Sequence, residues 1–94
     1  MVVEIATFRP AVDEEAFLAA DRQAQTDYFY GRPGLIRRTT AKGHDGDWTV
    51  VTLWASEEDA TAAMAGAASD PAARAFLAAL DPASVRVERY QTLD

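Results

Sequence analysis

Apolar and β-branched residues gather in four short runs along the chain, and turn-forming residues bound each run. Runs of this length, rich in valine, isoleucine, threonine and aromatic residues, are typical of β-strands. The pattern therefore predicts strands over residues 2–8, 35–41, 48–54 and 85–90. The polar stretch 42–47, rich in glycine and aspartate, is expected to join the second and third strands as a hairpin.

A first helix is predicted between the first two strands. Asp13 is a suitable N-cap, and Glu14 and Glu15 match the positive end of the helix dipole. We expect this helix to extend to about Tyr30. The segment 31–34, which holds two glycines and a proline, then ends it.

A second helical region is predicted after the third strand. Ser56 and Asp59 resemble a capping box at the start of a helix over 57–68. Pro71 suits a first helical position, so a new segment is expected to begin there and to run to about Leu80. The second helical region is therefore expected to be broken.

The order strand–helix–strand–strand–helix–strand fits one domain over residues 1–94. It predicts a ferredoxin-like α+β sandwich with βαββαβ topology and a four-stranded antiparallel sheet. Both helical regions are expected to cover the same face of that sheet. The opposite face is then free to meet water or a partner.

That opposite face is predicted to be apolar. In the third strand Trp48, Val50 and Trp54 share one side, while Val51 and Leu53 share the other. An antiparallel sheet face that meets water normally carries polar residues. We therefore expect a second copy of the chain to cover it in a homodimer, and a monomer with an uncovered apolar face is the alternative.

Composition and charge exclude several classes of partner. The formal net charge of −6 argues against nucleic acid, because phosphate binding needs a basic surface. No apolar run reaches the roughly 18 residues of a membrane span. The absence of cysteine removes disulfides and thiolate ligands, and it fits a cytoplasmic location.

Four features of the sequence carry a family resemblance. They are the turn Pro33-Gly34-Leu35, the segment VVTLWASEEDA over 50–60, the broken second helix and a last strand that ends in Arg89-Tyr90. With them the chain resembles the dimeric α/β-barrel superfamily, and more specifically the small proteins related to antibiotic-biosynthesis monooxygenases. The resemblance implies paired sheets that form a barrel, and often a ligand cavity between sheet and helices within each protomer.

The resemblance also implies two chemistries. Some members oxygenate polycyclic phenols without a cofactor, whereas others degrade haem with an asparagine, a tryptophan and an iron-ligating histidine. This chain has no asparagine, and its single histidine, His44, lies in the predicted hairpin, so Trp54 alone matches. A metal site needs several convergent ligands, so the stretch 44–47 is better interpreted as a solvated turn. We expect no cofactor and no metal.

Asp21, Gln25 and Tyr28 are the polar candidates on the first helix. Their spacing of four and three residues can place them on one flank. As catalytic residues, Asp21 or Tyr28 would accept or relay a proton, and Gln25 would bind substrate. The alternative is that Asp21 and Gln25 are solvated and that Tyr28 belongs to the core.

Trp54 and Phe76 are candidate contacts for a flat aromatic ligand. The Trp54 indole could stack on such a ligand and donate through its N–H. Phe76 could face the aromatic cluster at residues 28–30 across a pocket. Ordinary core packing explains these residues equally well.

Adjacent arginines on the second strand complete the set. Arg37 and Arg38 point to opposite faces, so one of them approaches a buried surface or the strand edge. An inward arginine could stabilise a phenolate or an oxyanion, and Arg38 is the candidate for this catalytic role. The alternative for the sheet arginines, Arg89 included, is an ion pair with Glu4, Glu88 or a partner carboxylate.

Two functions from different classes remain open. The first is a cofactor-free, monooxygenase-like oxidoreductase acting on a small planar phenolic or polyketide-type substrate. The second is a non-catalytic homodimeric module that binds a ligand or a partner. Convergence of Asp21, Gln25, Tyr28 and Trp54 on a cavity of roughly a few hundred cubic ångströms would favour the enzyme. A cavity filled by aromatic side chains would favour the module.

Overall fold

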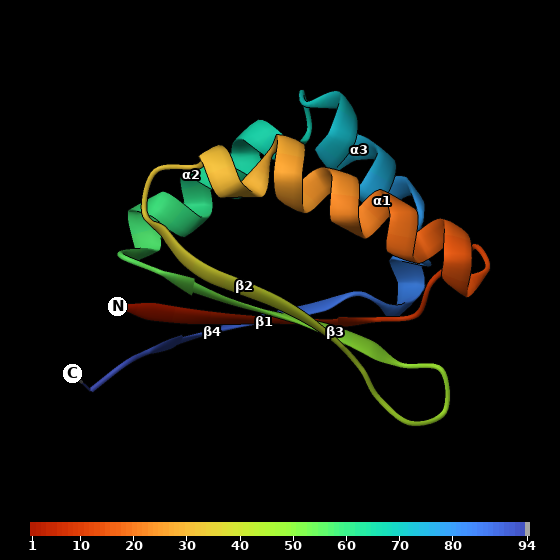
Figure 1. The fold of residues 1–94 in the computed structure, drawn as a ribbon. Coiled ribbons are helices and arrows are strands. Elements are labelled where there is room, and N and C mark those ends of the chain that lie inside the picture. Colours follow the sequence, from red (N-terminus) through yellow and green to blue (C-terminus); the bar gives the residue numbers. More distant parts are fainter. Residues whose placement is uncertain (94) are drawn as a thin grey trace.

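The computed structural model describes residues 1–93, and it shows one sheet with helices above it (Figure 1). The strands are β1 (Val2–Phe8), β2 (Leu35–Lys42), β3 (Trp48–Trp54) and β4 (Arg86–Gln91). Their order in the sheet is β2-β3-β1-β4, and every neighbouring pair is antiparallel. The predicted ferredoxin-like βαββαβ sandwich is confirmed.

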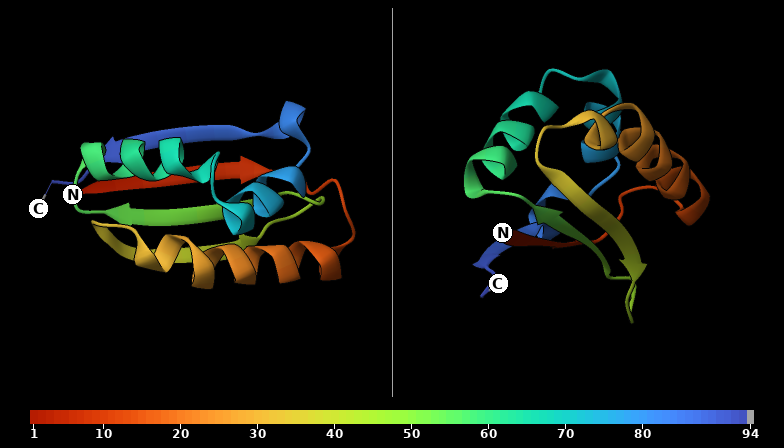
Figure 2. Two further views of the ribbon diagram at one scale, coloured as in Figure 1. Left: turned by 90° about the horizontal axis from the view of Figure 1, so that it is seen from above. Right: turned by 60° about the vertical axis from the view of Figure 1, so that its left-hand side comes forward.

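All helices lie on one face of the sheet (Figures 1 and 2). They are α1 (Glu14–Asp27), α2 (Glu57–Ala67) and α3 (Pro71–Ala78), with 3₁₀ turns at Phe29–Gly31 and Pro82–Ser84. The predicted caps are present. The Ala16 N–H donates to the Asp13 side chain over 2.8 Å, and the Asp59 N–H donates to Ser56 over 3.1 Å. The break before Pro71 falls where the sequence indicates it.

The first helix ends earlier than its pattern predicts. We expected it to reach about Tyr30, but α1 stops at Asp27 and a 3₁₀ turn follows. Tyr28 and Phe29 are both buried, with their rings 5.0 Å apart, whereas Tyr30 is 60% exposed. A regular α-helix would turn successive side chains by about 100°, so the 3₁₀ turn gives Phe29 a different direction relative to Tyr28. The change of winding places the two rings inside.

A bulge near the start of β2 decides which side chains of that strand face the helices. Leu35 pairs with Trp54 and Arg38 pairs with Thr52, with the register shift between Leu35 and Arg37. Paired residues share a face, so Leu35 and Arg38 both lie on the helical side although they are three positions apart. A regular strand would place them on opposite faces.

Aromatic residues fill the core between sheet and helices. The Phe17 ring from α1 lies 5.5 Å from the Phe8 ring and 5.0 Å from the Trp48 ring, measured between centroids. The opposite face of the sheet has no helix over it within residues 1–93 (Figure 2). It carries Val3 and Leu53, which pair across β1 and β3, and Ile5 and Val51, which pair next to them.

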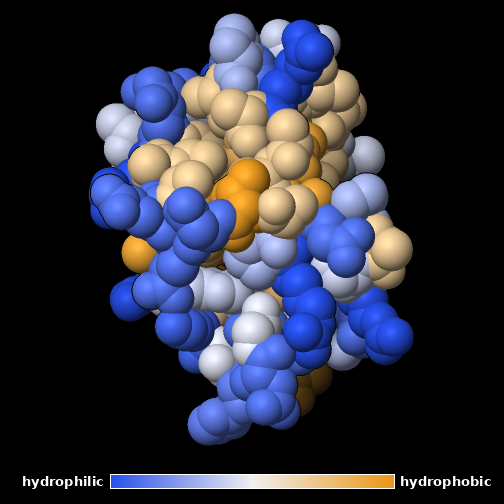
Figure 3. Space-filling model, turned by 90° about the vertical axis from the view of Figure 1, so that its right-hand side faces the viewer, coloured by the Kyte–Doolittle hydropathy of each residue, from blue (hydrophilic) through white to orange (hydrophobic). Residues whose placement is uncertain are grey.

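The surface is mixed in character. Seen from the end that bears the β2–β3 hairpin, apolar residues gather in the helical layer and hydrophilic residues lie below it (Figure 3). None of the helices within residues 1–93 has the length and apolar character needed to cross a membrane.

Candidate active site

One polar row crosses the whole sheet on its helical side. Arg38 of β2 pairs with Thr52 of β3, Thr52 pairs with Glu4 of β1, and Glu4 pairs with Arg89 of β4. Arg38, Thr52 and Glu4 are all buried. The next row on this face consists of Thr40, Val50, Ala6 and Val87. Charged groups therefore lie on the floor of a largely apolar interior.

The Arg38 side chain is bound by two side chains of α1 and lies against two phenyl rings. Its Nη2 donates to Asp21 over 2.8 Å, and its Nη1 donates to Gln25 over 3.1 Å. Its guanidinium carbon lies 4.7 Å from the Phe29 ring centroid and 5.3 Å from that of Phe76. The side chain is only 1% exposed. Arginine stays charged in proteins, so this buried cation depends on the Asp21 carboxylate and the two ring faces.

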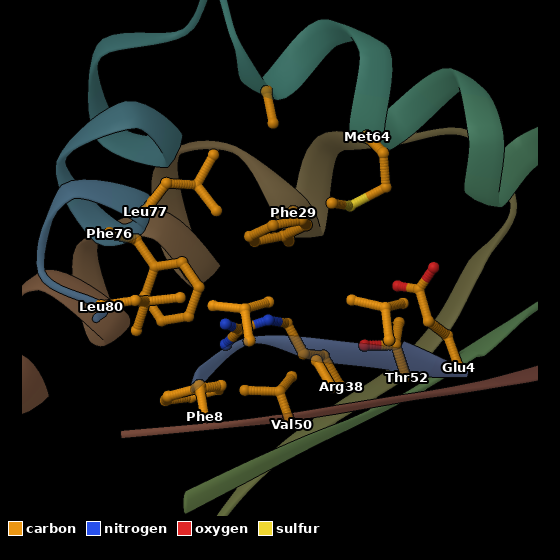
Figure 4. A pocket seen from close by; sticks show the side chains of 14 residues that line it. Glu4, Phe8, Phe29, Arg38, Val50, Thr52, Met64, Phe76, Leu77 and Leu80 are labelled. Atoms are coloured by element: carbon orange, nitrogen blue, oxygen red, sulfur yellow. The ribbon is translucent and has the colours of Figure 1, made fainter. Parts of the chain in front are cut away.

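Beside Arg38 lies a cavity of about 70 Å³ between the sheet and helices α2 and α3 (Figure 4). Arg38, Thr52 and Glu4 border its floor, and most other lining residues are apolar. Its outer rim consists of partly exposed side chains, which are Met64, Leu77, Val85 and Val87. A ligand that enters here meets an apolar rim first and the polar row afterwards.

Glu4 is the carboxylate of the cavity floor. Its Oε2 accepts a hydrogen bond from Arg89 Nε over 2.8 Å. Arg89 Nη1 also donates to Glu57 over 2.8 Å and to Thr61 over 2.9 Å, so it links β4 to α2. The pKa of Arg89 is raised, chiefly by the hydrogen bond to Glu57 and further by Glu4, while burial opposes the rise. The ion pair with Glu4 is the alternative foreseen for this arginine.

Two of the candidate site residues border the cavity, namely Arg38 and Phe76. Asp21 and Gln25 do share a flank of α1, but they lie behind Arg38 and bind its guanidinium. Asp21 is buried rather than solvated. These two residues therefore reach the cavity only through Arg38.

Tyr28 and Trp54 pack away from the cavity lining. The Tyr28 hydroxyl donates to the carbonyl oxygen of Ala63 on α2. Burial raises the pKa of Tyr28; the Arg32 charge opposes this rise and Asp70 adds to it. Trp54 is 1% exposed, and its indole N–H has no hydrogen-bond partner within residues 1–93. The structure thus separates these rings from Arg38 and Phe76.

Glu4, Thr52 and Met64 border the cavity although the sequence patterns did not single them out as site residues. The sequence does contain a signal that Glu4 and Thr52 face the interior. Glu4 shares its side of β1 with Val2 and Phe8, and Thr52 lies between buried residues of β3. A polar residue on the apolar side of a strand points into the interior and needs an explanation.

Haem and metal ligands are not gathered at this site. His44 is exposed in the β2–β3 turn, and no histidine borders the cavity. Within residues 1–93 no three His, Cys, Asp or Glu side chains are placed to share a metal ion. The residues of the cavity do not fit the iron-ligating pattern of the haem-degrading proteins.

The chain shares its fold with solved structures of antibiotic biosynthesis monooxygenase-like proteins. No family model matches the chain, and no curated protein matches its sequence. The likeness comes from solved structures, and at these sequence identities it concerns the fold.

Three solved structures illustrate this likeness in fold. SnoaB, a cofactor-independent oxygenase from Streptomyces nogalater, superposes with a TM-score of 0.81 at 17% identity, over 99% of this chain and 93% of its own. A protein of Nitrosomonas europaea, provisionally assigned as an antibiotic biosynthesis monooxygenase, gives 0.75 at 19% identity over 100% of both chains. A variant of MhuD with two manganese protoporphyrin IX molecules per active site gives 0.70 at 18%, over 99% and 95%.

Proposed function

We propose that the chain is a cofactor-independent, monooxygenase-like oxidoreductase acting on a small planar phenolic or polyketide-type substrate. One observation carries this proposal: a buried arginine, with its guanidinium over the rings of Phe29 and Phe76, borders a largely apolar cavity. A positive group held there favours an ionised phenol over its neutral form. The apolar walls keep water from the anion and strengthen that interaction.

The proposed reaction balances without an added cofactor. A substrate SH₂ and O₂ give S=O and H₂O: one oxygen atom enters the substrate and the other leaves as water with the two substrate hydrogens. The substrate supplies the electrons, so the protein has to favour its anion and exclude water. Arg38 provides the charge, and Phe29 and Phe76 provide flat walls.

The size of the cavity limits the substrate. An apolar cavity of about 150 Å³ holds one benzene ring, and the cavity here has about 70 Å³. A ring therefore enters when the rim widens. Met64 and Leu77 are 36% and 40% exposed and can turn outward. We expect one ring inside and the remainder of the substrate at the rim.

Oxygen uptake tests the proposal. Purified protein is mixed with hydroquinone-type compounds, without flavin or metal, and O₂ consumption is compared with product formation. The proposal expects one O₂ consumed per product. Arg38→Lys should slow uptake at least about tenfold, because an ammonium cannot replace the planar donors and the stacking. Arg37→Lys, on the opposite face of β2, is the matched control and should leave the rate unchanged.

A non-catalytic ligand-binding module is the second candidate, and a specific observation favours it. Phe17, Tyr28 and Trp54 are almost fully buried and occupy the core. The remaining cavity is smaller than the few hundred cubic ångströms expected of a small-ligand site. Saturable binding of the same compounds with no oxygen uptake would support this function and contradict the enzyme.

We also propose that the open sheet face packs against a second copy of the chain. Val3, Ile5 and Leu53 form an apolar strip on that face. Val51, in the same strip, is 36% exposed. A face of this kind is stabilised when it is removed from water. The proposed assembly is the homodimer that the sequence predicts.

A further inference from the structure

We propose that Glu4 is the catalytic base of the site and accepts the acidic hydrogen of the phenolic substrate. This inference rests on the proposed function and adds a proton acceptor to the cavity that Arg38 borders. Figure 4 shows the Glu4 carboxylate rising from the floor on the side of Thr52 and Met64, while the Arg38 guanidinium lies on the side of Phe76. The cavity therefore has a carboxylate at one end and a guanidinium at the other, and each is paired outside the cavity floor: Glu4 with Arg89 and Arg38 with Asp21.

Hydrogen bonds leave one Glu4 oxygen available. Within residues 1–93 the hydrogen bond to this carboxylate comes from Arg89 to Oε2. Oε1 is the atom left for a ligand. An ionised carboxylate is an acceptor only, so a substrate O–H is a suitable partner for it. The Thr52 hydroxyl lies next to it on the same row and adds a donor or an acceptor.

The other candidate bases are engaged elsewhere. Asp21 binds Arg38 and does not border the cavity. The Tyr28 hydroxyl donates to Ala63, away from the cavity lining. Among the described residues that border the cavity, Glu4 is the carboxylate. Proton acceptance from a bound substrate therefore falls to Glu4.

The spacing of the row matches a ring with oxygens on opposite edges. Arg38 and Glu4 are separated by one strand, so their Cα atoms are about 10 Å apart. A ring between the two side chains places one hydroxyl at Glu4 and the opposite oxygen near Arg38. The proton passes from the substrate oxygen to Glu4 Oε1. The O–H electron pair stays on the substrate, and the negative charge spreads across the ring towards Arg38.

An anaerobic binding experiment isolates this step from oxygen chemistry. The probe is 4-nitrophenol, whose ionised form absorbs visible light, at a pH below the probe's own pKa. The wild-type protein should bind the probe as the phenolate without net proton release, because Glu4 takes the proton. Glu4→Gln has no group that can take this proton, so it should either bind the neutral probe, with the visible band lost, or bind the phenolate and release about one proton to the solvent per bound probe. Glutamine can still accept from Arg89, so the fold is maintained.

Two further variants complete the test. Glu58→Gln makes the same chemical change at an exposed position of α2 and should behave as wild type. Glu4→Asp keeps the charge but shortens the side chain, so the visible band should be weakened rather than lost. In turnover, Glu4→Gln should lower kcat about 10²–10⁴-fold, with KM changed only a few-fold.

The outcomes separate this inference from the proposed function. Bound phenolate in Glu4→Gln with no net proton release, as expected of the wild type, would overturn the role of Glu4. Retained oxygen uptake in that variant would do the same and would leave the oxygenase proposal standing. No oxygen uptake by the wild type, together with Glu4-dependent ionisation of 4-nitrophenol, would overturn the oxygenase and keep Glu4 as the proton acceptor of a binding site.

Discussion

At the residue scale, Gly66 on α2 allows the Tyr28 hydroxyl to approach the helix. A Cβ atom at residue 66 would lie 2.6 Å from that oxygen. Gly66→Ala should therefore destabilise the protein by about 1–3 kcal/mol through overpacking. In a Tyr28→Phe background the same change should become stabilising by up to about 1 kcal/mol, because the clash is gone and alanine favours the helix.

Urea denaturation of the wild type, Gly66→Ala, Tyr28→Phe and the double variant measures whether Gly66→Ala raises or lowers the free energy of unfolding in each background. Gly31→Ala is the control, since an added Cβ there meets nothing within 4 Å. Equal effects of Gly66→Ala in both backgrounds would show that the tyrosine oxygen is not the cause.

Tyr28 also gives the fold a dependence on alkaline pH. Its pKa is raised, mainly by burial, while Arg32 acts in the opposite direction. A raised pKa in the folded state means that this contribution to stability is complete below the unfolded tyrosine pKa of about 10. The contribution is lost as the pH rises through the folded value. The free energy of unfolding should therefore fall above about pH 10, and less so in Tyr28→Phe.

Denaturant midpoints across this pH range provide the measurement. Tyr90 is half-exposed, and its pKa is raised by its hydrogen bond to Glu88. Tyr90→Phe is accordingly the comparison for a tyrosine at the surface. A Tyr28→Phe curve parallel to that of the wild type would contradict the assignment.

At the element scale, Arg38 joins β2 to α1. It pairs with Asp21 over 2.8 Å, and the two side chains are 1% and 10% exposed. Arg38→Met should reduce the free energy of unfolding by about 3–5 kcal/mol, because it leaves a buried carboxylate without its partner. Adding Asp21→Leu should recover part of the loss, because the uncompensated charge is then removed as well.

A double-mutant cycle in urea measures this coupling. The surface pair Lys42 and Glu14, in which both side chains are more than half exposed, offers a matched cycle on the same two elements. Its coupling should be below about 1 kcal/mol. If the changes in unfolding free energy at Arg38 and Asp21 are additive, the ion pair does not couple α1 to β2 and the prediction is wrong.

At the scale of the whole molecule, the open sheet face is where we propose that two copies of the chain meet. Light scattering should give a mass of about twice the 10.2 kDa of one chain. Val51→Glu places a charge in the apolar strip and should give a monomer. Val12→Glu changes a similarly exposed valine, 42% against 36% for Val51, in the segment before α1 and should leave the dimer intact. A mass near that of one chain for the wild type at micromolar concentration would refute the dimer.

The fold itself was predictable because its signals are local. N-caps such as Asp13 and Ser56, and strands bounded by glycine and proline, depend on neighbours within a few residues. The predicted end of α1 near Tyr30 was wrong for a physical reason. Burial of Phe29 against Arg38 and Tyr28 outweighs the preference of the chain to continue as a helix.

The sequence by itself therefore determined the elements, their order and the apolar character of both sheet faces. Tertiary structure decided the site. The β2 bulge turns Arg38 inward together with Leu35. The pairing of three strands aligns Arg38, Thr52 and Glu4 in one row, and the cavity lies beside α2 and α3. The bulge decides which face of the sheet the following side chains take, and the packing of helices on the sheet decides where a cavity is left. Both depend on contacts between residues far apart in sequence, so no local pattern contains them.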